Sequence, residues 1–107
     1  MPAVFTDRNR KMFILLNEKL TYAEIPGSIN EIPAFVFSNC TSLKTLKLGN
    51  GIKSIGEYAF SYTNIGFIDI PDSVTSIGNY AFMLTDGTYY IRLGKGVETI
   101  GKSAFFL

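Results

Sequence analysis

The nine residues IKSIGEYAF, at positions 52–60, decide the fold of this chain because the phrase recurs along it. It returns as VTSIGNYAF at 74–82 and VETIGKSAF at 97–105, and in weaker form as INEIPAFVF at 29–37. The phenylalanines that end these copies are separated by 23, 22 and 23 residues. A fixed period in this range is typical of a solenoid, in which each coil buries its apolar face only against its neighbours. The period therefore predicts one buried stack made of Phe37, Phe60, Phe82 and Phe105.

A second recurrent phrase predicts a strand in each coil. Its pattern is Leu-x-x-Leu-x-Leu at 43–48, with related forms at 20–25, 65–70 and 88–93. The alternation at its end is typical of a strand with one buried face. The Ile-x-x-Ile pair of the first phrase predicts a second, shorter extended piece. The glycine that follows it, as at Gly56, predicts a turn into a brief helical stretch that carries the Ala-Phe pair.

The unit IPDSVTSIGNYAF at 70–82 resembles the repeat of the BspA-like, or Treponema pallidum-type, leucine-rich repeats. The segment AFVFSNCTSL at 34–43 resembles the Ala-Phe-x-x-Cys-x-x-Leu segment of the same family. The resemblance covers residues 20–107, which hold about three and a half repeats of 22–23 residues. It implies an α/β, strand-dominated, right-handed leucine-rich-repeat solenoid with a parallel sheet along one face and short helical turns. Cys40 falls on the family's cysteine position and is interpreted as a small buried core residue, with Thr63 and Thr85 in its place in later coils.

The two ends of the chain fall outside this regular pattern. Residues 1–19 precede the period and are predicted to cap the first coil, with the apolar run at 12–16 forming either a helix or a strand. The chain stops in mid-repeat at Phe105, Phe106 and Leu107 without a C-terminal cap. Solenoids need polar caps, so three explanations stay open for this apolar end. The chain is a fragment of a longer protein, it pairs with another copy of itself as a homo-oligomer, or a partner covers it.

The composition argues against catalysis and against cofactor, metal or nucleic-acid binding. The 107 residues contain no histidine, and the single cysteine, Cys40, therefore has no histidine to activate it. The carboxylates show no calcium-loop spacing. Ten basic and nine acidic residues leave a net charge of +1, too little to draw the chain to nucleic acid or to a membrane. No run approaches the ~20 apolar residues of a membrane span, and residues 1–19 do not have the pattern of a secretory signal.

The outward positions of the predicted strands form the only candidate site. A charged column alternates in sign, and it either fixes the strand register or forms one wall of a binding groove; it contains Glu24, Lys47, Asp69 and Arg92. The column beside it contains Tyr22, Thr45, Phe67 and Tyr90, with Tyr89 next to the last. Exposed aromatic side chains are typical binding anchors, although aromatic residues also simply favour strands.

These observations predict a non-enzymatic module that binds a protein partner. The family resemblance implies a bacterial surface or secreted protein that binds host or matrix proteins, in keeping with an adhesion role and a longer exported chain. The family also has relatives in protists and bacteriophages. The alternative is therefore a structural assembly subunit, for example of a bacteriophage particle, and the absence of an export signal at the start of the chain favours it.

Overall fold

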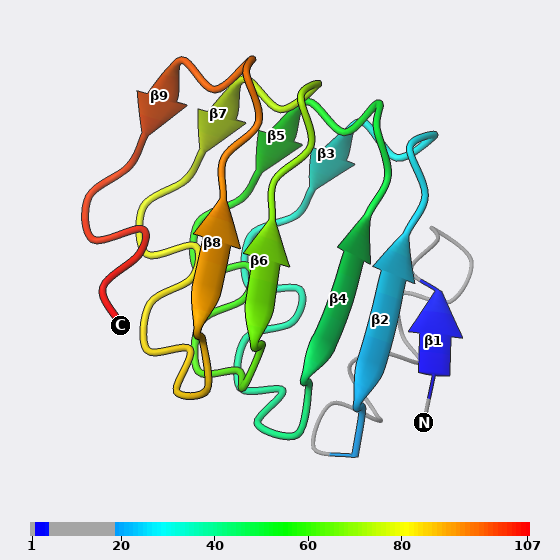
Figure 1. Ribbon diagram of the computed structural model, residues 1–107, viewed down its shortest axis with the longest axis vertical. Coiled ribbons are helices and arrows are strands. Elements are labelled where there is room, and N and C mark those ends of the chain that lie inside the picture. The colour runs from blue at the N-terminus through cyan, green and yellow to red at the C-terminus, as the bar shows by residue number, and fades with distance from the viewer. Residues whose placement is uncertain (1, 5–18) are drawn as a thin grey trace.

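A computed structural model of the chain describes residues 2–4 and 19–107, with side chains from residue 19 onward (Figure 1). Each coil contributes one strand to each of two rows. The first row contains β2 (Tyr22–Ile25), β4 (Thr45–Leu48), β6 (Phe67–Asp69) and β8 (Tyr90–Arg92). The second row contains β3 (Glu31–Ile32), β5 (Ser54–Ile55), β7 (Ser76–Ile77) and β9 (Thr99–Ile100). The predicted solenoid is confirmed, and both recurrent phrases form extended structure.

All strand pairs among the described residues are parallel, but they do not form one sheet along one face as predicted. The second row is a continuous four-stranded sheet in the order β3-β5-β7-β9. The first row is divided into a sheet of β1 (Pro2–Val4), β2 and β4 and a separate pair of β6 and β8. The strand face is therefore interrupted between β4 and β6. The two-residue strands β3, β5, β7 and β9, which the sequence predicted only as short extended pieces, form the more continuous sheet.

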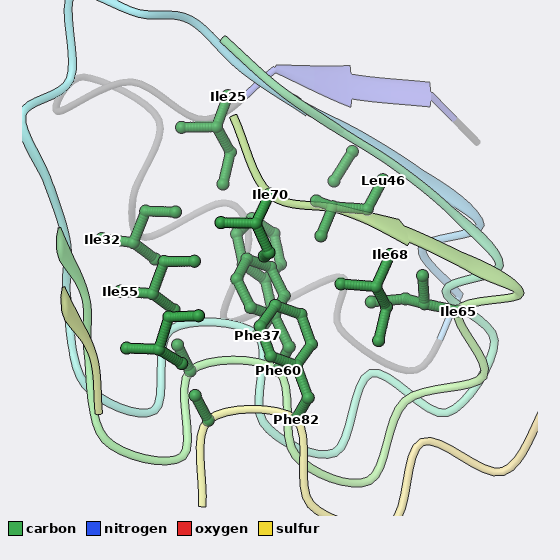
Figure 2. Packing of buried hydrophobic residues seen from close by; sticks show 14 of the residues in the cluster. Ile25, Ile32, Phe37, Leu46, Ile55, Phe60, Ile65, Ile68, Ile70 and Phe82 are labelled. Carbon is green, nitrogen blue, oxygen red and sulfur yellow. The ribbon is translucent and has the colours of Figure 1, made fainter. Parts of the chain in front are cut away.

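The phenylalanine stack runs through the middle of the solenoid between the two rows (Figure 2). The ring centroids of successive members lie 5.3, 5.1 and 5.3 Å apart, and the rings are nearly parallel. Phe37, Phe60 and Phe82 are fully buried, whereas Phe105 in the last coil is only partly buried. Isoleucines from the second row, such as Ile55, pack on one side of the stack, and inward residues of the first row, such as Ile68, lie on the other. The predicted stack is confirmed.

The small-residue positions after the phenylalanines are also as predicted. Cys40 is fully buried, and Thr63 and Thr85 occupy the equivalent places in the next coils with almost no exposure. A buried hydroxyl needs a hydrogen-bond partner. Each threonine finds one in its own turn, since the Thr63 hydroxyl donates to the carbonyl of Phe60 at 2.9 Å and the Thr85 hydroxyl to that of Phe82 at 3.3 Å.

The helical turns predicted around the Ala-Phe pairs are wrong, because no helix occurs in residues 2–4 or 19–107. Tyr58 and Tyr80, which stand just before these pairs, have left-handed φ angles of 59° and 61°, which a right-handed helix excludes. The backbone N–H groups are used between coils instead. That of Tyr58 donates to the carbonyl of Asn79 at 3.0 Å, and that of Phe60 donates to Ala81 at 2.7 Å.

A second aromatic stack follows from these left-handed turns. Phe35, Tyr58 and Tyr80 have equivalent positions in successive coils, and their ring centroids lie 4.9 and 4.7 Å apart. A left-handed conformation costs a residue with a side chain about 1–2 kcal/mol. An aromatic pair contributes about 0.5–1.5 kcal/mol beyond the area it buries. The stacking energy is therefore of the size needed to offset the backbone strain.

The N-terminal segment is described only in part. β1 pairs in parallel with β2, and Ala3 is in register with Ala23, so residues 2–4 extend the first sheet by one strand. The apolar run at 12–16 lies outside the described residues. Capping of the first coil by residues 1–19 therefore stays a prediction.

The phenylalanine stack predicts a difference between two identical substitutions. Phe60→Ala removes a ring that is fully buried between two others, and we expect it to lower the free energy of unfolding by about 3–5 kcal/mol. Phe105→Ala removes a partly buried ring with one stacked neighbour and should cost clearly less. Urea denaturation of both variants measures the difference, and equal losses would contradict the stack as the main element of the core.

The left-handed turns predict a stabilising substitution at Ser103, whose φ angle is 52°. Glycine relieves about 1–2 kcal/mol of left-handed strain and loses about 0.5–1 kcal/mol more chain entropy on folding. Ser103→Gly should therefore raise the melting temperature slightly. Ser103→Val should lower it, because a β-branched residue tolerates this conformation poorly. Thermal melts followed by circular dichroism would reject this account if the order of the two variants were reversed.

Candidate functional site

The aromatic column lies on the outer surface of the first row of strands, as its sequence pattern predicted. Phe67 and Tyr90 are in register on β6 and β8, and their ring centroids lie 5.0 Å apart with the planes tilted by 41°. They are 39% and 56% exposed, and Tyr89 beside them is 80% exposed. Tyr22 and Thr45 are in register on β2 and β4. The aromatic surface is thus concentrated on the β6–β8 half of the face.

The charged column forms an ion pair at one end only. Arg92 donates a hydrogen bond to the Asp69 carboxylate at 2.8 Å, and this bond is the main cause that raises the pKa of Arg92. Glu24 is in register with Lys47, but its carboxylate accepts a hydrogen bond from the Tyr22 hydroxyl at 2.7 Å, which raises the pKa of Tyr22. Within residues 19–107 every ion pair involves Arg92. The predicted ladder is therefore formed on β6 and β8 and not across β4.

A groove of about 770 Å³ lies where the first row of strands is interrupted. The residues that line it belong to β4 and β6 and to the turns before β4, β6 and β8; they are Lys44, Thr45, Leu46, Lys47, Leu48, Asn64, Gly66, Phe67, Asp69, Gly87 and Tyr89. Its volume falls within the range of about 300–1,000 Å³ that is usual for ligand sites. The groove brings together three of the predicted site residues, Lys47, Phe67 and Asp69, with a fourth, Tyr89, from the corner before β8.

The interruption opens part of the core to the groove. Leu46 on β4 is 8% exposed, whereas Ala23 and Ile68, its equivalents on the neighbouring strands, are fully buried. Leu48 is half-buried, although Ile25 and Ile70 beside it are also fully buried. The inward residues of β4 thus add an apolar floor to the groove.

Hydrogen bonds join the two coils on either side of the interruption. At the corner before the strands, the N–H of Gly66 donates to the carbonyl of Lys44 at 3.2 Å. Beyond the strands, the Ser73 hydroxyl donates to the carbonyl of Ile52 at 2.7 Å and accepts from the N–H of Gly51 at 2.8 Å. The two coils are therefore joined on either side of the stretch in which β4 and β6 are unpaired.

Sequence reasoning did not identify the groove residues that lie outside the two columns. Lys44 stands in the corner before β4, where no column position marked it. Gly66 lies beneath Tyr89, since a Cβ atom built on it would come within 2.7 Å of the Tyr89 ring. A side chain at Gly66 would displace that ring. The only sequence sign near this place is the corner Thr63-Asn64-Ile65, which is one residue shorter than the equivalent Cys40–Leu43 corner.

The described residues offer binding groups more than reactive ones. Burial raises the pKa of the Cys40 thiol to about 12, so it is not the thiolate that acts as nucleophile or metal ligand. Residues 19–107 contain no cluster of three or more potential metal-binding side chains. No helix long and apolar enough to cross a membrane occurs in the part of the chain that the structure describes. What the site presents is aromatic surface, an apolar floor and cationic side chains.

The last coil exposes the apolar residues predicted as an assembly end. Phe106 and Leu107 are 61% and 51% exposed, and Ile100 on β9 is nearly half exposed. Phe105 packs its ring on Phe82 and is partly buried. The C-terminus and β9 lie at the opposite end of the solenoid from β2 and β3, beyond β6 and β8 (Figure 1).

Two solved structures are similar to this solenoid. A leucine-rich repeat protein from Bacteroides ovatus matches 84% of the chain with 26% sequence identity and a TM-score of 0.75. The pneumococcal vaccine antigen PcpA matches 78% of the chain with 25% identity and a TM-score of 0.69. The matches cover 24% and 21% of those proteins, so the chain spans about a quarter of their length. No curated protein sequence matches it significantly.

The repeats identify the family. The sequence pattern of the BspA type leucine rich repeat region matches six times and covers residues 9–107. The parallel coils, the phenylalanine stack and the buried Cys40 position agree with that match. The chain belongs to the BspA-type leucine-rich repeat family.

Proposed function

We propose that this chain is a non-enzymatic module that binds a protein partner through the outer face of β2, β4, β6 and β8. The observation that carries the proposal is the exposed aromatic surface of Phe67, Tyr89 and Tyr90. Aromatic residues are enriched among the few side chains that supply most of the binding energy in protein interfaces. Phe67 and Tyr90 lie on strands, so little conformational entropy is lost when a partner binds them.

The exposed aromatic residues are not needed to complete the core. The inward positions of the same strands, such as Ile68, already fill the space beside the phenylalanine stack. Phe67 and Tyr90 contact each other on the solvent side, where a cross-strand pair contributes only about 0.2–1 kcal/mol to stability. Their apolar surface is therefore available for a partner.

We further propose that the module belongs to a bacterial surface or secreted protein and serves adhesion to a host or matrix protein. Its similarity to a pneumococcal vaccine antigen supports this setting. The chain spans about a quarter of these structural relatives, and further coils beside it are part of this proposal. The face of β2 to β8 would then be one part of a longer binding surface.

A displayed peptide library tests the binding face. Peptides selected on the wild-type chain should lose affinity about tenfold or more for the double variant Phe67→Ser with Tyr90→Ser. The melting temperature should change little, because both side chains are exposed. The matched control is Phe35→Ser with Tyr62→Ser, which removes two exposed aromatic rings from the turn side. Peptides that bind the double variant as well as the wild type would refute the proposed face.

The second candidate is an assembly subunit, for example of a bacteriophage particle, and the exposed apolar residues of the last coil favour it. Under this proposal the chain associates with another copy through Phe106 and Leu107. Light scattering of residues 1–107 should then show a defined oligomer, and Phe106→Asp should dissociate it. A monomer for the wild-type chain would count against assembly while leaving the binding face untouched.

A further inference from the structure

We propose that the groove between β4 and β6 binds an extended peptide segment of the partner in which acidic side chains alternate with aromatic or large apolar ones. This inference rests on the proposed function of the strand face and names the chemistry of its partner. It follows from three properties of the groove: an interrupted sheet with an apolar floor, a cationic wall and an aromatic wall.

The groove is suited to an extended backbone. Backbone N–H and C=O groups of a strand point alternately to its two sides. The N–H groups of Thr45 and Gly49 point to the previous coil, where they donate to Thr21 and Ile25. Those of Leu46 and Leu48 must therefore point toward β6, with which β4 forms no strand pair. Cα atoms of β4 and β6 still lie within 8 Å of each other, and a strand needs about 4.8 Å on either side. A peptide therefore lies over the unpaired stretch and its apolar floor, and not between the two strands.

The charges favour an acidic partner. Lys44 and Lys47 line the β4 side, and neither forms an ion pair with another residue in the part of the chain that the structure describes. Among the described residues that line the groove, Asp69 alone is acidic, and its carboxylate accepts a hydrogen bond from Arg92 at 2.8 Å. The groove therefore presents two cationic side chains and one carboxylate that is already neutralised.

The opposite wall favours aromatic or large apolar side chains. Phe67 and Tyr89 line it, and the ring of Tyr90 extends it, with its centroid 5.0 Å from that of Phe67. Side chains of an extended peptide project alternately to opposite sides. A segment that lies along the groove can therefore direct its acidic side chains to the lysines and the others to the aromatic rings.

The length of the groove limits the segment. β4 has four residues and β6 has three, and a strand rises about 3.3 Å per residue. The unpaired stretch therefore runs beside about three to four extended residues. A longer partner would continue across the aromatic surface of β8.

The experiment uses a short fluorescein-labelled peptide of alternating glutamate and phenylalanine, and a counterpart in which glutamine replaces glutamate. Fluorescence anisotropy with the full chain should show tighter binding of the glutamate peptide. This preference should shrink as salt is raised, because exposed charges are screened. Lys44→Gln with Lys47→Gln should weaken binding of the glutamate peptide about five- to tenfold and remove its advantage over the glutamine peptide. Equal affinity of the wild-type chain for the two peptides, or no measurable binding of either, would overturn the inference.

The matched control is Lys53→Gln with Lys102→Gln, which removes the same charge from residues that flank the second row of strands. It should leave binding of the glutamate peptide unchanged, and an equal loss with this control would mean that only net charge matters. The experiments distinguish a failure of the acidic-peptide proposal for the groove from a failure of the proposed binding face. Library peptides that require Phe67 and Tyr90 but ignore Lys44 and Lys47 would retain the face and reject the acidic groove. Dependence on the two lysines with none on the aromatic rings would reject the proposed face itself.

Discussion

Hydrogen bonds between equivalent turns of successive coils hold this solenoid together, and the rest of the structure depends on them. The N–H groups of Phe37, Phe60 and Phe82 each donate to the carbonyl of an alanine in the next coil, at 2.7–2.8 Å. Because each bond joins residues one repeat apart, it sets the distance between coils. That distance places the phenylalanine rings 5.1–5.3 Å apart, within the range for stacked aromatic pairs. The distance between coils therefore determines both the hydrogen bonds of the turns and the packing of the phenylalanine rings.

The same constraint explains which parts of the fold follow from the sequence. Side chains that must recur in every coil, such as Phe60 and the small residue at the Cys40 position, can be recognised because they repeat at a fixed period. The phenylalanine stack could be predicted from that period. The turn at Tyr58 could not, because its left-handed φ angle contradicts the preference of an aromatic residue. The pattern around Ala59 alone suits a short helix. Only bonding of the turn N–H groups to the next coil makes the left-handed turn the better solution.

Part of the candidate site could likewise be predicted from the sequence, and part could not. The outward columns could be predicted, since strand alternation places Phe67 and Tyr90 on one surface. The groove could not be predicted, because it lies where β4 and β6 do not pair, and the sequence pattern of the two strands gives no sign of this. The shortened corner at Thr63-Asn64-Ile65 lies nearby, yet β6 still pairs in register with β8. A shorter corner therefore does not by itself reveal an interrupted sheet, and Lys44 gains its role only from that interruption.

Interrupting the strand face costs this solenoid less than it would cost an isolated sheet. Each coil is bonded to the next at three places, namely the strand face, the second row of strands and the turns. Between the coils that contain β4 and β6, the turn bonds, the β5–β7 pair and the bridge through Ser73 remain. The core beside the groove stays buried apart from the slight exposure of Leu46 and the half-buried Leu48. A repeat of this kind can therefore lose strand pairing and vary its surface at the strand face while it keeps its fold. This tolerance is consistent with a binding groove at that face.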